Sequence, residues 1–154
     1  MGLVVITGTI LAMVAYADTS IAPTILEGKA DITCIDSDSC EYAKLASDYP
    51  DYHKLLNEMS VRNPTLGCVV NAESQCNNYN DDGTIKRGKA GEFGIAQFMA
   101  PTFYGWSKQM KFETADVTSP TDELIIMYWA FKNHLENNWT TLKDCMPHLL
   151  RPPC

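Results

Sequence analysis

The chain has 154 residues, of which 45% are hydrophobic and 20% are charged. This length and composition are typical of one globular domain and leave no room for two cores of ordinary size. The formal net charge of −7 disfavours non-specific binding to nucleic acid, because a phosphate backbone attracts basic surfaces.

The first residues have the pattern of a secretory signal peptide. Residues 1–17 carry an apolar run with no charged side chain before Asp18, and Ala15-Tyr16-Ala17 has the small-x-small pattern of a cleavage site. The run is shorter than the about 20 apolar residues that a spanning helix needs. We expect cleavage after Ala17, no stable membrane span afterwards, and a secreted, periplasmic or cell-wall location.

All six cysteines follow the expected cleavage site, at positions 34, 40, 68, 76, 145 and 154. An even number of cysteines in an exported chain is typical of disulfides. Without a Cys-x-x-Cys pair, zinc is disfavoured, and we expect neither a metal nor a cofactor. The sequence does not select one pairing. Pairing of near neighbours, 34 with 40, 68 with 76 and 145 with 154, is the simplest expectation.

The mature chain predicts a mostly α fold in one domain. Residues 18–40 are acidic and rich in small residues, which indicates a lead-in segment before a domain over residues 41–154. Apolar side chains at helical spacing predict helices around residues 42–46 and 52–59, with Pro50 between them.

Two later signals predict a helix start and a short β element. Asn63-Pro64 pairs a capping residue with proline at the first helical position. Residues 77–91 are polar and predict a loop or a small β-hairpin with its tip at Asp82-Gly83.

The last part of the chain predicts further helices. One is expected to resume near Gly94 or Pro101, and Ser119-Pro120 signals another start. Residues 124–135 are apolar nearly all round, as in a central core helix. A short helix is expected over residues 139–145.

Glu73 is the residue that we expect to carry chemistry. It follows Val69 and Val70 by four and three residues, so it shares their helix face and lies near the helix end. Partial burial and the negative end of the helix dipole both favour a protonated carboxyl. A protonated carboxyl is the group needed to donate a proton to a glycosidic oxygen.

Two motifs around Glu73 carry a family resemblance. Residues 72–75 read Ala-Glu-Ser-Gln, and residues 91–103 read Gly-Glu-Phe-Gly-Ile-Ala-Gln-Phe-Met-Ala-Pro-Thr-Phe. Together they resemble the soluble lytic transglycosylase family of the lysozyme-like superfamily, which has Glu-Ser at a helix end followed by a Gly-x-x-Gly-Leu-Met-Gln-x-x-Pro-x-Thr segment. The resemblance covers roughly residues 52–145. It implies a mostly α (α+β lysozyme-like) domain with a short hairpin or loop after the catalytic helix.

The resemblance also implies an activity and a partner. Members of the family cleave the β-1,4 bond between N-acetylmuramic acid and N-acetylglucosamine in peptidoglycan and leave a 1,6-anhydro ring. By this resemblance Glu73 is the catalytic acid and base. Ser74 would orient it, and Gln97 and Met99 would line the sugar groove, with Tyr128 as a further substrate-binding candidate. We expect a monomer that binds glycan strands and no nucleic acid.

A hydrolytic, goose-type lysozyme is the nearest alternative, since it shares the fold and the Glu but uses a second carboxylate to activate water. Asp81, Asp82, Glu92 and Asp116 are the candidates for that carboxylate. A non-catalytic glycan-binding relative is another alternative.

A calcium-binding loop belongs to a different class of function. Asn78, Asn80, Asp82 and Gly83 match the opening of an EF-hand loop, but Lys89 occupies the position of its last, bidentate acid. A polar turn built on Asp82-Gly83 is the simpler interpretation.

Overall fold

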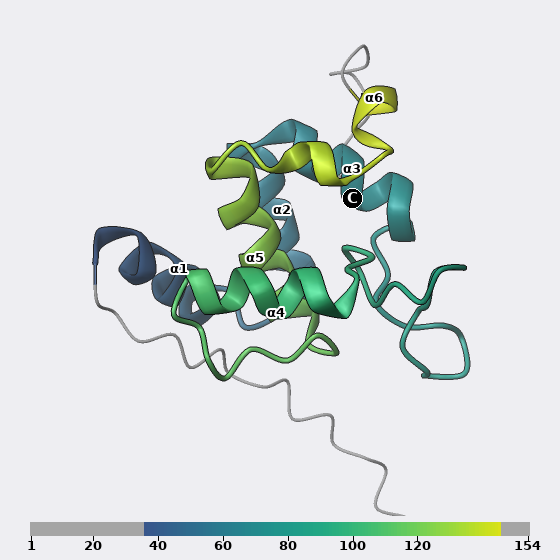
Figure 1. The fold of residues 1–154 in the computed structure, drawn as a ribbon, viewed down its shortest axis with the longest axis horizontal. Coiled ribbons are helices and arrows are strands. Elements are labelled where there is room, and N and C mark those ends of the chain that lie inside the picture. Colours follow the sequence, from purple (N-terminus) through teal and green to yellow (C-terminus); the bar gives the residue numbers. More distant parts are fainter. Residues whose placement is uncertain (1–35, 146–154) are drawn as a thin grey trace, which may run out of the picture.

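The computed structural model describes residues 36–145, and residues 1–35 and 146–154 lie outside the described part. Within the described part the chain is mostly helical and forms one domain around a central helix (Figure 1). The expected mostly α fold class is therefore confirmed. The expected signal peptide and most of the acidic lead-in lie outside the described residues.

The first two helices begin at aspartate caps. Helix α1 (Ser37–Asp48) starts after Asp36, whose carboxylate accepts a hydrogen bond from the Ser39 amide at 2.8 Å. Helix α2 (Tyr52–Arg62) starts in the same way after Asp51. Side-chain acceptors at these positions satisfy amides that have no partner inside the helix. The expected lead-in therefore overlaps α1 in its last residues.

Helix α3 (Pro64–Ser74) begins and ends close to where the sequence predicts. The Asn63 side chain accepts a hydrogen bond from the Leu66 amide, and Pro64 occupies the first helical position. The helix ends at Gln75, which adopts a left-handed conformation with φ of 57°. This end places Glu73 in the last turn.

Residues 75–99 form a loop with three isolated antiparallel bridges, Tyr79–Ile85, Arg87–Phe93 and Phe93–Phe98. The first bridge closes on the turn at Asp82-Gly83, where Gly83 has φ of 80°. This loop is the predicted β element, although none of its bridges extends into a strand. It lies to one side of the helices (Figure 1).

Helices α4 (Ala100–Gln109) and α5 (Pro120–Lys132) pack on each other. All residues of α5 except Trp129 and Lys132 are buried, and α1, α2 and α3 also contact this helix. The predicted central helix is confirmed, although it ends at Lys132 because His134 turns into a left-handed conformation with φ of 58°.

The end of the described chain consists of a 3-10 helix, η1 (Glu136–Asn138), and a short helix α6 (Leu142–Cys145). Trp139 is extended instead of helical, so α6 begins later than expected. Helix α6 packs against α3.

A disulfide joins Cys68 of α3 to Cys145 of α6, with a Cα–Cα distance of 5.7 Å. The expected pairs of 68 with 76 and 145 with 154 are therefore wrong. Cys76 lies just after the end of α3 at Ser74. Ser74 is already about 9 Å along the helix axis from Cys68, beyond the about 7 Å that a disulfide spans. Cys40 and Cys76 are also disulfide-bonded. The expected pair of 34 with 40 includes a residue outside the described range.

Residues 36–145 contain no helix that is both long enough and apolar enough to cross a bilayer.

Candidate functional site

A surface cavity of about 190 Å³ opens where the end of α3, the 75–99 loop, α4 and the η1–α6 connection meet. This volume is below the range typical of pockets for drug-sized ligands. Its lining combines carboxylate, amide and hydroxyl groups with aromatic rings. The lining residues are Glu73, Glu92, Gln97, Phe98, Met99, Thr102, Trp106, Asn138, Trp139 and Thr140.

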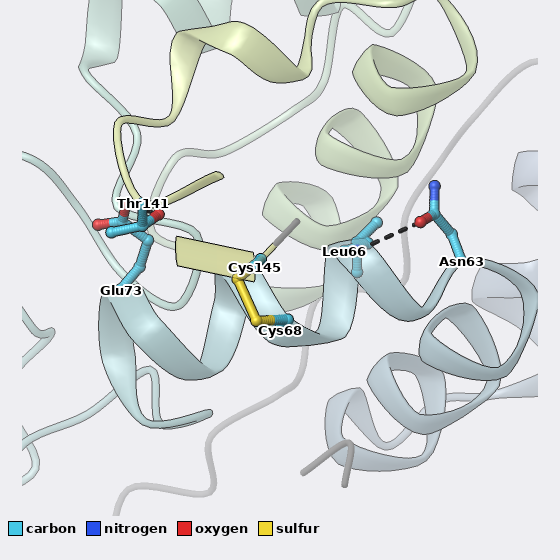
Figure 2. The surroundings of a disulfide bond; sticks show 6 residues. All are labelled: Asn63, Leu66, Cys68, Glu73, Thr141 and Cys145. Carbon is cyan, nitrogen blue, oxygen red and sulfur yellow. Dashed lines mark hydrogen bonds between the residues drawn. A yellow bond between two sulfur atoms is a disulfide. The ribbon is translucent and has the colours of Figure 1, made fainter. Parts of the chain in front are cut away.

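Glu73 is held at the cavity by a hydrogen bond from the η1–α6 connection. The Thr141 hydroxyl donates to Glu73 Oε1 at 2.7 Å (Figure 2). Both residues lie near the Cys68–Cys145 disulfide, which ties α3 to α6. The disulfide therefore keeps the Thr141 hydroxyl within reach of the carboxylate, while the second oxygen of Glu73 has no such bond within the described residues.

Gln97 reaches the cavity from a tight turn over residues 94–97. Phe93 and Phe98 close this turn through two backbone hydrogen bonds of 2.9 and 3.0 Å. Gln97 is left-handed, with φ of 52°, and its side-chain amide donates to the Gly94 carbonyl at 2.6 Å. That bond uses one donor of the amide, so its other groups remain available to a ligand.

Aromatic side chains form the apolar part of the cavity. The rings of Phe98, Trp106 and Trp139 contact one another, with centroid distances between 5.3 and 5.8 Å. The Trp139 indole N–H donates to the Ala96 carbonyl at 2.8 Å, so this ring also anchors the turn. Met99 and Tyr104 are exposed nearby on the chain, at 43% and 48%.

Of the four candidate second carboxylates, Glu92 alone lines the same cavity as Glu73. Its Oε2 accepts a hydrogen bond from the Ala90 amide at 2.9 Å. Asp81 and Asp82 line a separate depression on the far part of the loop. Asp116 accepts hydrogen bonds from the amide and the hydroxyl of Thr118, each at 2.8 Å, as an exposed turn residue does.

The structure brings Glu73, Gln97 and Met99 together but not Ser74 or Tyr128. The Ser74 hydroxyl is buried and donates to the Val70 carbonyl at 3.0 Å, inside α3. Tyr128 packs edge-on against Tyr42 on the α1 side of α5. Neither side chain is part of the cavity lining.

The calcium-loop alternative has no support in the geometry. Asn78 is fully buried, and its side-chain oxygen accepts a hydrogen bond from the Ile95 amide at 2.9 Å. Asp82 accepts hydrogen bonds from the amide and hydroxyl of Thr84. Two of the expected opening ligands are therefore engaged within the chain.

Sequence reasoning missed Thr141 and Trp139 as parts of the site. Both follow η1: Trp139 lines the cavity and Thr141 bonds Glu73, in a segment that the disulfide between α6 and α3 holds in place. The signal that could have found them was the pairing of Cys68 with Cys145, which sequence spacing does not determine.

Comparison with known protein families, characterised proteins and solved structures found no match to this chain.

Proposed function

We propose that this protein is an exported peptidoglycan lytic transglycosylase. The observation that carries the proposal is the meeting of Glu73, Gln97 and Met99 in one cavity. Glu73 and Gln97 are more than twenty positions apart in the sequence, and the two motifs that contain them resemble the soluble lytic transglycosylase family.

In the proposed reaction one carboxyl acts first as the general acid and then as the general base. Glu73 in its acid form donates a proton to the oxygen between N-acetylmuramic acid and N-acetylglucosamine, as the bond from the muramic C1 to that oxygen breaks. The resulting carboxylate then accepts the proton of the muramic C6 hydroxyl, whose oxygen closes the 1,6-anhydro ring. Since Thr141 already donates to Oε1, the transferred proton belongs on Oε2.

The other cavity groups suit a glycan. The Gln97 amide can both donate and accept, as hydroxyl and acetamido groups require. The exposed Met99 offers apolar surface to a sugar ring, and the largely buried Trp106 and Trp139 line the cavity beneath. The Cys68–Cys145 disulfide is consistent with an exported protein, because disulfides persist in oxidising compartments.

The test is mass spectrometry of purified peptidoglycan after digestion with the mature protein and with Glu73→Gln. The proposal expects anhydromuropeptides from the wild type and none from the variant. Equal products from both proteins would contradict the role of Glu73.

Hydrolysis is the second candidate, because Glu92 shares the cavity with Glu73. A carboxylate on the same cavity could activate a water molecule, as in inverting glycosidases. Reducing-end muropeptides that disappear in Glu92→Gln would favour this alternative. Asp82→Asn is the matched control, since Asp82 lines a different depression.

A further inference from the structure

Glu123 is a fully buried carboxyl that the proposed reaction does not use. It lies in the first turns of α5 and has an exposed fraction of 0%. Its Oε2 accepts a hydrogen bond from the Ala96 amide at 2.8 Å. Its Oε1 has no hydrogen-bond partner among the described residues. Buried carboxyl oxygens without a partner are rare and need an explanation.

The carboxyl belongs to a set of bonds that hold the 94–97 turn from several sides. The Ile95 amide donates to the side-chain oxygen of Asn78, and the Trp139 indole donates to the Ala96 carbonyl. The Gly94 amide donates to the Lys86 carbonyl at 2.9 Å. The turn that carries Gln97 into the cavity is therefore fixed by backbone bonds, by Asn78 of the same loop and by the side chains of Glu123 and Trp139 from outside the loop.

Close packing at Gly94 leaves little freedom to this arrangement. Gly94 has φ of 67°, and a Cβ at this position would collide with both oxygens of the Glu123 carboxyl and with the Asn78 side chain. The carboxyl thus lies directly against the turn backbone. A change in its charge or hydration acts on the turn without an intervening side chain.

The surroundings of the carboxyl disfavour its charged form. Burial raises the pKa of Glu123 well above its ordinary value of 4.5, and the nearby Ala96 and Ile95 amides, which lower this pKa, do not reverse the effect; the neighbouring carboxyl of Asp122 on the same helix raises it further. The ammonium of Lys86, on the loop that faces Gly94, bonds the Ser74 carbonyl. Asp116, in the segment before α5, adds another negative charge beside Asp122.

We propose that Glu123 is a positioning residue that holds the 94–97 turn in its neutral, protonated form, and that its ionisation releases the turn and displaces Gln97 from the cavity. Loss of its proton to water leaves a buried anion without a cation, which is costly in a low-dielectric interior. Opening of the turn admits water to that anion. The proposal concerns the shape of the cavity and holds whatever reaction the cavity supports.

The experiment is a pH titration of the folded chain by NMR. The ¹³C resonance of the Glu123 side-chain carboxyl reports its protonation directly, and the ¹⁵N–¹H resonance of Ala96 reports the turn. We expect Glu123 to remain protonated at a pH where an ordinary Glu carboxyl is ionised. We also expect the Ala96 resonance to shift with the same, more alkaline midpoint.

Variants separate this effect from other titrations. In Glu123→Gln, which keeps a neutral acceptor, the Ala96 resonance should no longer titrate. Exposed Glu113→Gln is the matched control, and Asp122→Asn removes the neighbouring titration; both should retain the Ala96 titration. A Glu123 that ionises in the wild type at the pH of an ordinary Glu carboxyl overturns the proposal even if the Gln variant does not fold. So does an Ala96 resonance that titrates equally in Glu123→Gln.

Discussion

The helical body and the 75–99 loop are stabilised in different ways, and the cavity lies where they meet. In the body, helices α2, α3 and α5 bury apolar side chains such as Leu56, Val69 and Ile125 against one another. Such packing is non-directional and tolerates small adjustments. In the loop, the Ile95 and Ala96 amides donate hydrogen bonds to the side-chain oxygens of Asn78 and Glu123, and hydrogen bonds depend on direction. Apolar packing places the helix that carries Glu73, whereas directional hydrogen bonds place the turn that carries Gln97.

The largest expected loss of stability follows removal of the disulfide that ties α3 to α6. The Cys68–Cys145 disulfide spans 77 residues. In the double variant Cys68→Ser/Cys145→Ser, the free energy of unfolding should fall by about 4 kcal/mol, because the unfolded chain regains the entropy of a long loop. Chemical denaturation without reductant measures this loss and leaves the disulfides of Cys40 and Cys76 intact. A loss below about 1 kcal/mol would contradict the expectation that this disulfide stabilises the fold.

A single added methyl group should have opposite effects on stability in the loop and in the helical body. Gly94→Ala introduces a Cβ into the space of Glu123 and Asn78 at a positive φ. Strain and overpacking together should lower the free energy of unfolding by about 3 kcal/mol or more. Gly105→Ala is the matched control, since nothing lies near its added Cβ inside α4. It should stabilise the protein by roughly 0.5–1 kcal/mol. Similar thermal shifts for the two variants would refute the contrast.

Asp122 at the start of α5 should make stability depend on pH. Burial raises the pKa of Asp122 from 3.8 to about 6. Below about pH 4 the carboxyl is protonated in both the folded and the unfolded chain. Between about pH 4 and 6 the unfolded chain loses this proton first, so stability falls as pH rises, by about 3 kcal/mol in total.

The variant Asp122→Asn should remove that part of the pH dependence while it keeps an acceptor for the Asp116 amide. Unfolding free energies of both proteins, measured at a series of pH values, test this expectation. A difference between the two proteins that stays constant from about pH 4 to pH 6 would contradict it.

The smallest expected effect lies wholly in the body. Asn63→Ala removes the side-chain cap of α3 and should cost about 1 kcal/mol, because one helical amide loses its acceptor. The cavity should keep its shape, since the Thr141–Glu73 bond lies at the other end of α3. Thermal denaturation measures the loss. A shift as large as that of Gly94→Ala would mean that the cap supports more than its own helix.

The same contrast explains which features the sequence predicts. Caps such as Asn63 and Ser119 and the periodic apolar residues act locally, so the order of the helices follows from the chain alone. The end of α3, and with it the position of Glu73, follows in the same way. The disulfide of Cys68, the hydroxyl of Thr141 and the carboxyl of Glu123 act on partners far away in the sequence. No local pattern encodes such contacts, and they were not predicted.

Ser74 illustrates a further limit of sequence reasoning. Adjacent residues of a helix point in different directions, so a motif neighbour of Glu73 need not share its surface. The Ser74 side chain turns into the helix interface and bonds the backbone of its own helix. Spatial neighbours such as Thr141 occupy the place beside the carboxylate.

The most direct test of the central claim, that Glu73 is the acid of this cavity, compares rates of muropeptide release. Wild type, Glu73→Gln and the exposed-site control Glu113→Gln would digest purified peptidoglycan at equal concentrations of folded protein. We expect the rate to fall by about 10²–10⁴-fold in Glu73→Gln alone, the usual contribution of a general acid and base. Release by Glu73→Gln at the rate of the control would contradict it.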